Sequence, residues 1–396
     1  MKIFYNCKSS KWSHITPELE VTIGGVKQVI SPQILNPESV PFNLQYKNGH
    51  VGPIIGILTA KKTDGSIAGN GPLFTKLQKK LISQKGISFI FTPDEVSEVS
   101  IDGYTFLPNQ NQWIKIKMPY PDLVYNRVPF RSTEQGENFQ TFIQGLREKK
   151  IPFFNPRFID KFELYQHFTI HPILQAYTPH TEQIQNSQHL YSFLEKFPTA
   201  YLKPANSSKG NGIFRIKLIN STELSLEGVK KIEHYQSIQD FWDQCESTLI
   251  NKNYIIQEEI PSALIDGKRF DFRILAHADN DNYVVTGIGI RQSQEQDITT
   301  HLPNGGKLLP YHLIQSNEHD TFINEVVELV GKTLSEKLGY FGEFSIDAGI
   351  NTFGKYYIYE VNSKPMSFDE EEIEERKINH LCRLFLLLTG FEYLLT

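Results

Sequence analysis

The chain has 396 residues, of which 39% are hydrophobic and 21% are charged, and its formal net charge is -5. This composition is typical of a globular protein and excludes a disordered one, and the length is sufficient for two or three packed subdomains. The slightly acidic balance gives no electrostatic reason to expect a nucleic-acid partner, although local basic clusters can still bind phosphate groups.

The cysteines and the apolar segments indicate where the protein is found. Cys7, Cys245 and Cys382 are far apart and odd in number, which argues against a disulfide framework and suits a reducing compartment. The first residues lack the apolar stretch of a signal peptide, and Leu384 to Leu388 is far too short to span a bilayer. We therefore expect a cytoplasmic protein that is neither secreted nor transmembrane and has no membrane partner.

The first 156 residues predict two units. Residues 1–50 alternate apolar and polar positions between Gly and Pro turns, which favours a small β-rich region. Residues 51–156 alternate strands and helices, which predicts a parallel, Rossmann-like α/β unit. The elements expected there are strands at 54–58, 87–92, 122–126 and 151–154, helices at 72–84 and 138–149, and a β-rich stretch ending near residue 117.

The remaining residues, 157–396, predict an α+β domain in two parts, 157–260 and 261–396. A helix is expected at 160–168, followed by a strand, a flexible loop and a second strand between residues 201 and 216. A long helix at 321–338 precedes two further strands, and a helix at 371–388 ends the fold. The fold class expected for the whole chain is α/β with α+β parts.

The segment 342–365, GEFSIDAGINTFGKYYIYEVNSKP, predicts two strands with a turn at Gly354. Residues two apart in a strand share a face, so Glu360 and Asn362 point the same way, and Asp347 can face them from the antiparallel neighbour. Two carboxylates and an amide oxygen form an oxygen-only site of the kind that Mg²⁺ prefers, with Mn²⁺ as an alternative, and Mg²⁺ usually keeps waters and substrate phosphates as further ligands. The pattern therefore predicts a magnesium–nucleotide site.

The segment 201–216, YLKPANSSKGNGIFRI, predicts a loop for phosphate between two strands. Glycines and serines at its tip allow backbone N–H groups to approach an anion, and Lys203 adds a positive charge. An ordinary Gly-rich hairpin is the alternative, since the Walker A pattern is absent. Lys161 follows Asp160 at a predicted helix start, where a cation is unfavourable without a partner, so it is either a second phosphate ligand or a surface lysine.

Three further segments carry polar residues in patterns that suit a nucleotide site. YIIQEEIP at 254–261 is a buried strand ending in Gln257, Glu258 and Glu259, where a hinge between sheets can meet an adenine. Asp271 and Arg273 share a face of the strand FDFRIL, and an arginine such as Arg291 can stabilise charge that develops during phosphoryl transfer. The run THLPNGGK at 300–307 predicts a closing loop. Each of these charges alone is more often a solvated or paired residue.

Taken in order, these segments resemble the ATP-grasp superfamily, which includes glutathione synthetase and D-alanine–D-alanine ligase. More closely, the chain resembles the YheC/YheD family of endospore coat-associated proteins over residues 50–392. The strings that carry this resemblance are PDLVYNRVPFR, IPFFNPRFIDKFELYQ, YLKPANSSKGNGIFRI, FDFRIL, ITTHLPNGGK and EVNSKPMSFDE. Each string is modest by itself, and their joint order is specific. The resemblance implies an ATP-grasp domain at 157–396, preceded by a pre-ATP-grasp unit at 51–156.

The resemblance also implies a role for each matching residue. Lys161 and Lys203 would contact the α- and β-phosphates of ATP, and Asp347, Glu360 and Asn362 would bind two Mg²⁺ ions. Asn304 and Gly306 would lie near the reacting carboxylate, and Arg273 and Arg291 would hold the γ-phosphate or an acyl-phosphate. The residues expected over the triphosphate are Ser207, Ser208, Gly210 and Gly212, and those expected at the adenine are Gln257, Glu258 and the backbone of Ile260.

The implied activity is an ATP-dependent carboxylate–amine (or thiol) ligase that works through an acyl-phosphate. Its partners would be ATP, a small-molecule or peptide carboxylate and an amine, with spore-coat proteins as further partners. Asn126, Arg127 and Arg131 follow a strand of the unit before the ATP-binding half, and we expect an acidic acceptor there because arginine suits a carboxylate. A coat scaffold that retains the fold without turnover, and phosphoryl transfer to a hydroxyl, remain alternatives.

Overall fold

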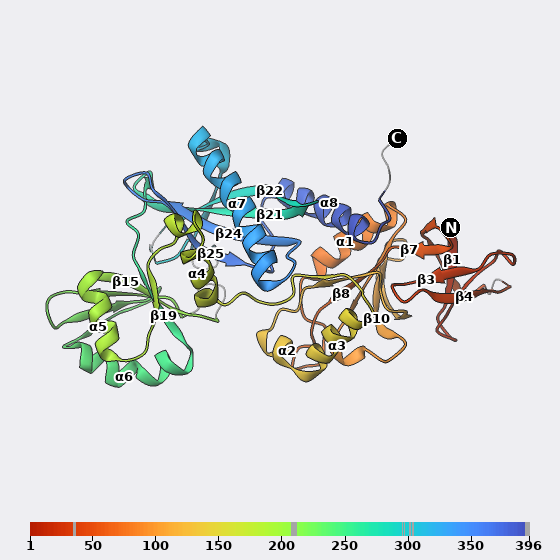
Figure 1. Ribbon diagram of the computed structural model, residues 1–396, viewed down its shortest axis with the longest axis horizontal. Helices are drawn as coiled ribbons and strands as arrows, with labels where there is room; N and C mark the ends of the chain where they lie inside the picture. Colours follow the sequence, from red (N-terminus) through yellow and green to blue (C-terminus); the bar gives the residue numbers. More distant parts are fainter. Residues whose placement is uncertain are drawn as a thin grey trace.

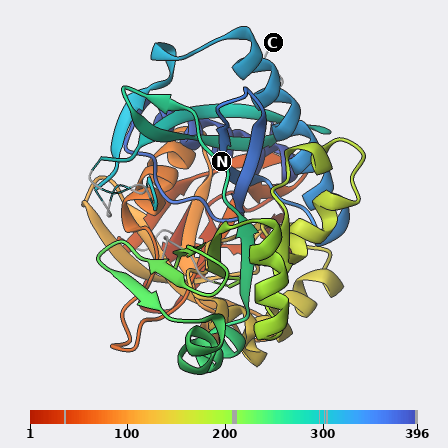
Figure 2. The ribbon, with the colours of Figure 1, turned by 90° about the vertical axis from the view of Figure 1, so that its left-hand side faces the viewer.

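The computed structural model describes residues 1–34, 37–206, 212–294, 296, 298–300, 302 and 305–392. Within them the strands form four β-sheets that follow one another along the long axis of the molecule (Figure 1). The N-terminal sheet lies at one end, and the sheet containing β15 and β19 lies at the other. Figure 2 shows the same chain from the end where β15 and β19 lie.

The N-terminal sheet has seven short strands in the order β5-β1-β2-β4-β3-β7-β6. Their bounds are β1 Lys2–Asn6, β2 Lys11–His14, β3 Val21–Ile23, β4 Gln28–Pro32, β5 Ser39–Asn43, β6 Gln45–Lys47 and β7 His50–Gly52. Buried residues of this sheet, such as Ile3 and Val51, share one hydrophobic core with Ile54 and Phe89 of the next sheet. The expected β-rich region is therefore present, and its core crosses the boundary predicted after residue 50.

The second sheet has the order β11-β10-β9-β8-β12-β13, and β9, β8, β12 and β13 run parallel. Its strands are β8 Ile54–Leu58, β9 Ile87–Phe91, β10 Ile101–Leu107, β11 Gln112–Met118, β12 Leu123–Asn126 and β13 Phe153–Phe154, with helices α1 Gly71–Ser83, α2 Arg131–Gln135 and α3 Glu137–Glu148. Every residue of β8 and β9 is buried, as expected for parallel strands covered on both faces. The predicted parallel α/β unit is present, and its last strand is shorter than expected.

The third sheet is antiparallel, with the order β14-β19-β15-β16-β17-β18. Its elements are β14 Thr181–Gln183, α5 Ser187–Lys196, β15 Thr199–Pro204, β16 Phe214–Leu218, β17 Leu224–Glu227, β18 Ile232–Tyr235, α6 Ile238–Asn251 and β19 Tyr254–Glu258. Helix α4, Lys161–Thr169, precedes it and begins where the Asp160 side chain accepts hydrogen bonds from two backbone N–H groups of the first turn. Leu190 and Phe241 of the two covering helices pack with Ile216 and Ile256 in a core of its own.

The fourth sheet has the order β23-β22-β21-β24-β25, with β20 paired to β21. Its elements are β20 Leu264–Ile265, β21 Lys268–Asp279, β22 Asn282–Gln292, β23 Lys307–Pro310, α7 Asn317–Leu338, β24 Glu343–Ile350, β25 Tyr356–Asn362 and α8 Glu371–Leu388. The turn between β24 and β25 contains Gly354 with φ +81, as the sequence predicted. Helix α7 starts four residues before its predicted start because the Ser316 side chain caps it.

The two long helices of the C-terminal part bind the fourth sheet to the rest of the molecule (Figure 1). Helix α7 packs against β22, and Ile373 of α8 packs against Gly287 of that strand. Further along, α8 reaches α1, and Phe385 joins Tyr125 and Phe154 of the second sheet in the largest core. This core crosses the boundary predicted at residue 156, so the predicted boundaries separate sheets and not cores. Among the described residues, no helix has the length and apolar character needed to span a membrane.

Gly331 of α7 provides a test of this packing. A Cβ at Gly331 would lie 2.2 Å from the Cγ atom of Tyr283, whereas a Cβ at Gly145 of α3 would meet nothing within 4 Å. We expect Gly331→Ala to lower the free energy of unfolding by about 1–3 kcal/mol despite the better helix propensity of alanine. Gly145→Ala, the control, should raise it by about 0.5–1 kcal/mol. Urea unfolding measures both values, and stabilisation by Gly331→Ala would contradict the packing.

Candidate functional site

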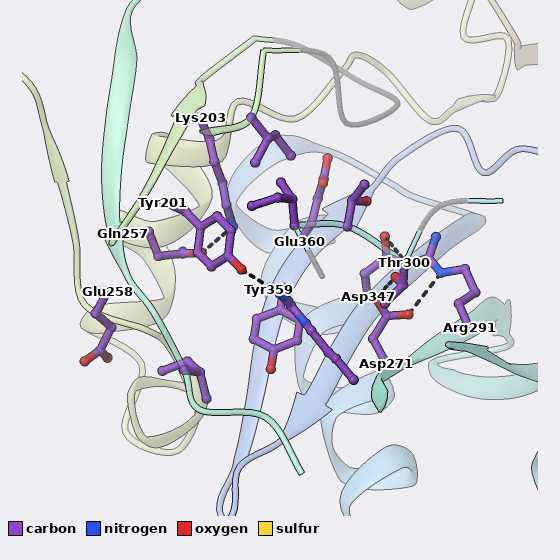
Figure 3. A pocket seen from close by; sticks show the side chains of 15 residues that line it. Tyr201, Lys203, Gln257, Glu258, Asp271, Arg291, Thr300, Asp347, Tyr359 and Glu360 are labelled. Carbon is purple, nitrogen blue, oxygen red and sulfur yellow. Dashed lines mark hydrogen bonds and ion pairs between the residues drawn. The ribbon is translucent and has the colours of Figure 1, made fainter. Parts of the chain in front are cut away.

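A polar cleft lies between β15 and β19 of the third sheet and β21, β24 and β25 of the fourth (Figure 3). Tyr201 and Lys203 face into it from β15, and Gln257 faces into it from β19. The opposite wall carries the side chains of Asp271, Arg291, Thr300, Asp347, Tyr359 and Glu360. Segments that are far apart in the sequence therefore bring cations and carboxylates together at one place.

The strand register places the predicted metal ligands next to one another. Asp347 of β24 stands directly opposite Glu360 of β25, and Ser345 stands opposite Asn362. Directly opposed residues of an antiparallel pair share a face, so both carboxylates and the amide lie on the same surface. The register shifts between Asp347 and Ala348, and this irregularity turns Tyr359 toward that surface as well.

Arg291 joins the carboxylates of two other strands. Its Nε donates to Asp271 Oδ1 at 3.0 Å, and its Nη2 lies 3.0 Å from Asp347 Oδ2. The second oxygen of Asp271 accepts a hydrogen bond from the Thr300 hydroxyl. Burial alone would lower the pKa of Arg291, but the two carboxylates outweigh it and hold this pKa above its ordinary value. Arg291 is therefore a fixed positive charge next to the carboxylate pair.

Two lysines complete the cationic side of the cleft. Lys161 Nζ lies 3.1 Å from Glu360 Oε1, and Lys203 Nζ donates to Gln257 Oε1 at 2.5 Å. Glu360 is thus the partner that a cation at the start of α4 requires. Burial lowers the pKa of Lys203 to about 8, and the Glu360 carboxylate opposes this shift. Lys203 is therefore still mainly protonated at neutral pH, and it loses its charge more readily than an ordinary lysine.

Strand β21 carries two arginines near the cleft, of which Arg269 lines it and Arg273 does not. Arg269 is not among the predicted site residues; its Nη1 donates to the Tyr201 hydroxyl at 2.7 Å, and its guanidinium lies over the Tyr359 ring. The alternation KRFDFR was the available signal, because it places Arg269, Asp271 and Arg273 on one face. Arg273 stands opposite Asp347 in the register of β21 and β24, and its Nη2 donates to the carbonyl of Met366 at 3.1 Å. Burial lowers the pKa of Arg273.

The donor set fits a divalent cation. Asp347, Glu360 and Asn362 supply hard oxygen ligands on one surface, which suits Mg²⁺ and leaves room for phosphate oxygens. No group of three His, Cys, Asp or Glu side chains with metal-binding geometry occurs in the described part of the chain, so a third protein ligand here would be the Asn362 amide. The surrounding lysines and arginines favour anionic ligands in the same cleft.

The other predicted nucleotide contacts are only partly brought together. Ile260 and Glu258 line the cleft, but the Glu258 carboxylate accepts a hydrogen bond from the backbone N–H of His180. Gly212, the last residue of the predicted phosphate loop, has φ +74, and both Gly212 and Gly306 lie outside the set of residues that line the cleft. The predicted residues Ser207, Ser208, Gly210 and Asn304 fall outside the described residues.

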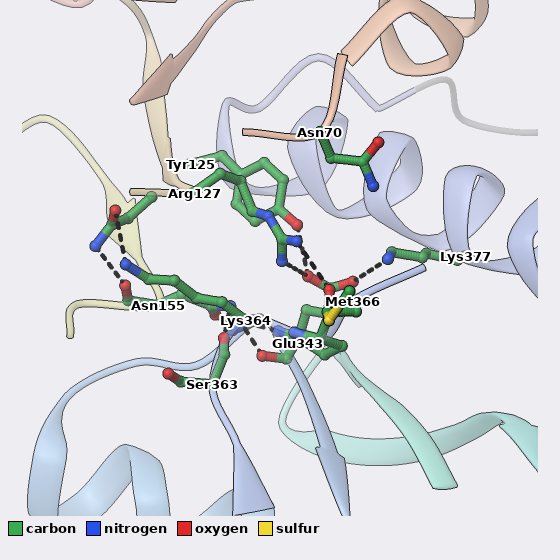
Figure 4. Close-up of polar contacts among 12 residues, drawn as sticks. Asn70, Tyr125, Arg127, Asn155, Glu343, Ser363, Lys364, Met366 and Lys377 are labelled. Carbon is green, nitrogen blue, oxygen red and sulfur yellow. Dashed lines mark hydrogen bonds and ion pairs between the residues drawn. The ribbon is translucent and has the colours of Figure 1, made fainter. Parts of the chain in front are cut away.

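The structure places the residues predicted for an acidic acceptor elsewhere (Figure 4). Arg127 is buried, lies 3.1 Å from Glu343 Oε2 and donates to the carbonyl of Pro365 at 2.8 Å. Asn126 is fully buried and donates to Glu134, and Arg131 donates to the carbonyl of Ile159 at 2.6 Å. These groups already have protein partners, so the prediction that they bind a carboxylate substrate gains no support from the geometry. The prediction relied on an arginine that follows a strand, whereas the partner of Arg127, Glu343, lies 216 positions away in the sequence and has no local signal.

The fold and the site define the class of protein. The chain has a mixed α/β ATP-grasp fold preceded by a β-rich region, and its structure is similar to that of the D-alanine–D-alanine ligase from Coxiella burnetii. The two are 9% identical with a TM-score of 0.52, and the match covers 86% of this chain and 94% of the ligase, so the similarity is one of fold.

A family model described as YheC/D-like ATP-grasp matches residues 150–388, and the chain belongs to this family. It is 26% identical to the endospore coat-associated protein YheD of Bacillus subtilis (strain 168) over 80% of this chain and 73% of the relative. It is 21% identical to the endospore coat-associated protein YheC of the same organism over 71% of this chain and 81% of the relative. The predicted family and fold class are thereby confirmed.

Glu343 provides a test of the buried ion pairs beside the site. Its carboxylate is fully buried, and although burial raises its pKa, Lys377 and Arg127 outweigh this effect and lower the pKa from 4.5 to about 2. A lowered carboxyl pKa contributes stability above pH 4.5, which is lost as the pH falls toward 2. We expect Glu343→Gln to lower the free energy of unfolding at pH 7 by about 3–5 kcal/mol.

The difference between the native chain and Glu343→Gln should narrow as the pH falls below 4.5. Urea unfolding at several pH values between 7 and 3 measures it, with the exposed Glu372→Gln of α8 as the control. A constant difference over this range would contradict the assignment of Glu343 as a buried carboxylate paired with cations.

Proposed function

We propose that this protein is an ATP- and Mg²⁺-dependent ligase that activates a carboxylate as an acyl-phosphate and joins it to an amine or a thiol. One observation carries the proposal. Asp347 and Glu360 oppose each other on neighbouring strands, and Arg291 and Lys161 lie within 3.1 Å of them on the same surface. Lys203 extends toward the same cleft from the facing sheet.

Each side chain has a defined part in this proposal. Lys161 and Lys203 bind the α- and β-phosphates of ATP, and Arg291 and Arg273 neutralise the charge that develops on the γ-phosphoryl group during transfer. Asp347, Glu360 and Asn362 would hold Mg²⁺, which supplies further charge neutralisation on the phosphates when bound. The cations that pair with carboxylates in this structure would then be shared with phosphate oxygens.

The reaction has two balanced steps. A carboxylate oxygen attacks the γ-phosphorus, the bond from that phosphorus to the β-bridging oxygen breaks, and ADP leaves. The amine or thiol then attacks the carbonyl carbon, loses a proton, and displaces inorganic phosphate as the carbon–oxygen bond breaks. The protein contributes mainly positioning and charge stabilisation, since these terms dominate phosphoryl transfer.

A coat scaffold is the second candidate, and the names of the relatives YheD and YheC as endospore coat-associated proteins favour it. Such a scaffold would bind ATP and Mg²⁺ without turnover. The paired carboxylates favour the ligase, because like charges on one sheet surface reduce stability unless cations balance them. We place the ligase in spore formation on the basis of the relatives' names.

The proposed function is tested by measuring ADP release in the presence of pools of amino acids, peptides and cell-wall precursors. The mass of any product is then determined by mass spectrometry. ADP release that depends on a pool and accompanies a new amide or thioester supports the ligase. Mg²⁺-dependent ATP binding without ADP release in any pool supports the scaffold. A new phosphate ester in place of an amide would instead assign phosphoryl transfer to a hydroxyl.

Asp347→Asn and Glu360→Gln test the metal ligands. Each change keeps the size of the side chain and removes one negative charge, and loss of one such electrostatic group typically raises the barrier by about 2.7–4 kcal/mol, or roughly 10²–10³-fold in rate. We expect ADP release to fall by at least this factor while the circular dichroism spectrum is unchanged. Asp281→Asn, in the exposed turn between β21 and β22, is the control. Native rates in either site variant would exclude the site.

Lys203 predicts a pH dependence of ATP binding. Since the pKa of Lys203 is about 8, its positive charge is lost as the pH rises through 8, while the triphosphate stays ionised. ATP affinity should therefore fall between pH 7 and pH 9.5 in the absence of metal. Lys203→Met should bind ATP more weakly at pH 7 and show a flatter profile. Calorimetric titration measures both profiles, and a flat native profile would contradict the role of Lys203.

A further inference from the structure

Asn155 connects the second sheet to the two strands that carry the proposed metal ligands (Figure 4). It follows β13, is fully buried and has φ +56, a left-handed conformation that asparagine tolerates better than most residues. Its Oδ1 accepts hydrogen bonds from the backbone N–H groups of Gly342 (3.0 Å) and Glu343 (3.3 Å). Its Nδ2 donates to the carbonyls of Glu343 (2.9 Å) and Ser363 (2.6 Å).

This amide stands where the ladder between β24 and β25 ends. The last paired residues are Ser345 and Asn362, and the chain bends at Ser363, directly after them. The side chain of Asn155 bridges Glu343, at the start of β24, to Ser363, directly after β25. The side chain of Asn155 therefore makes four hydrogen bonds at this end of the β24–β25 pairing, while the start of β24 stays paired with β21 through Glu343 and His277.

Four residues of the second unit hold the chain that follows Ser363. Lys364 Nζ donates to the carbonyl of Val128 at 2.9 Å and to Asn126 Oδ1 at 3.2 Å, and it pairs with Glu134. Arg127 donates to the carbonyl of Pro365 at 2.8 Å. Each of the three residues after Asn362 therefore has a buried or half-buried polar contact with the unit formed by residues 51–156.

We propose that Asn155, Asn126, Arg127 and Glu134 form a clamp, the strand-end clamp, that positions Asn362 and Glu360 for the divalent cation. These four are positioning residues, since none of them lines the cleft. The inference rests on the proposed function of the cleft as a Mg²⁺ site and adds the groups that set its geometry. Mutation of a residue that orients a metal ligand typically lowers the affinity for the metal by about 10–100-fold.

The test uses Asn155→Gly in the whole chain. Glycine keeps the left-handed backbone of residue 155 and removes all four side-chain hydrogen bonds. Asn280→Gly is the matched control, because Asn280 also has φ +56 but is exposed in the turn between β21 and β22 of the fourth sheet, which carries the proposed metal ligands. Asn155→Asp is the second variant, because it keeps the acceptor for the N–H groups of Gly342 and Glu343 and loses the donor to the carbonyls of Glu343 and Ser363.

The first measurement is the affinity of each protein for Mn²⁺ in the presence of ATP, detected by electron paramagnetic resonance. Competition by Mg²⁺ for the same site gives the Mg²⁺ affinity. The second is ATP binding without metal. We expect Asn155→Gly and Asn155→Asp to weaken Mn²⁺ and Mg²⁺ binding by about 10–100-fold, with metal-free ATP affinity and the control changed less than about twofold.

The outcomes separate this inference from the proposed function. Native metal affinity in both Asn155 variants, or an equal loss of metal-free ATP affinity, overturns the clamp while the metal site stands. If Asn155→Gly fails to fold, Asn155→Asp alone decides by the same two measurements. If the native chain binds ATP but shows no Mn²⁺ or Mg²⁺ site, the proposed function fails, and the clamp fails with it.

Discussion

One face of strand β24 carries the charges on which the rest of this structure depends. Glu343 and Asp347 share that face four residues apart, which corresponds to about 13 Å along a strand. Glu343 is fully buried between Arg127 and Lys377, and Asp347 lies at the cleft beside Arg291. A buried carboxylate is tolerated only when cations and hydrogen bonds replace the lost water. Each of these two carboxylates therefore requires positively charged side chains from the elements that pack against β24.

The carboxylate at the start of the strand joins the units of the protein. Arg127 comes from the second unit and Lys377 comes from α8, and both meet at Glu343. The Tyr125 hydroxyl donates to the same carboxylate at 2.5 Å. The hydrophobic contacts of α8 with Phe154 and Tyr125 surround these polar groups, so charge pairing and apolar burial act on the same interface. As a result, the position of β24 relative to the second unit is set by groups outside the cleft.

The carboxylate further along the strand has the opposite surroundings. Asp347 faces Glu360, and the nearby cations are distributed over both sheets, on β15, β21, β22 and α4. Strand β24 thus carries two ion clusters. The buried cluster around Glu343 joins the second unit to the C-terminal part, and the cluster around Asp347 faces the cleft. Residues 363–365 connect the two, because the second unit holds the carbonyls of Ser363 and Pro365 and the side chain of Lys364.

The sequence by itself determined the features that depend on local spacing. The turn at Gly354 and the alternation of the strand after it placed Glu360 and Asn362 on one face. The register shift between Asp347 and Ala348, which strand alternation does not predict, is what brings Asp347 opposite Glu360. Local spacing also determined α8, whose apolar period and acidic first turn gave its bounds, and the alternating strands before residue 50. Tertiary structure alone decided the long-range partners. Arg127 pairs with Glu343 and not with a substrate, Arg269 meets Tyr201, and Asn155 bridges two distant strand ends. The physical reason is that these contacts join residues 68 to 216 positions apart in the sequence. At such separations the packing of whole sheets determines which residues meet, and a local sequence pattern does not.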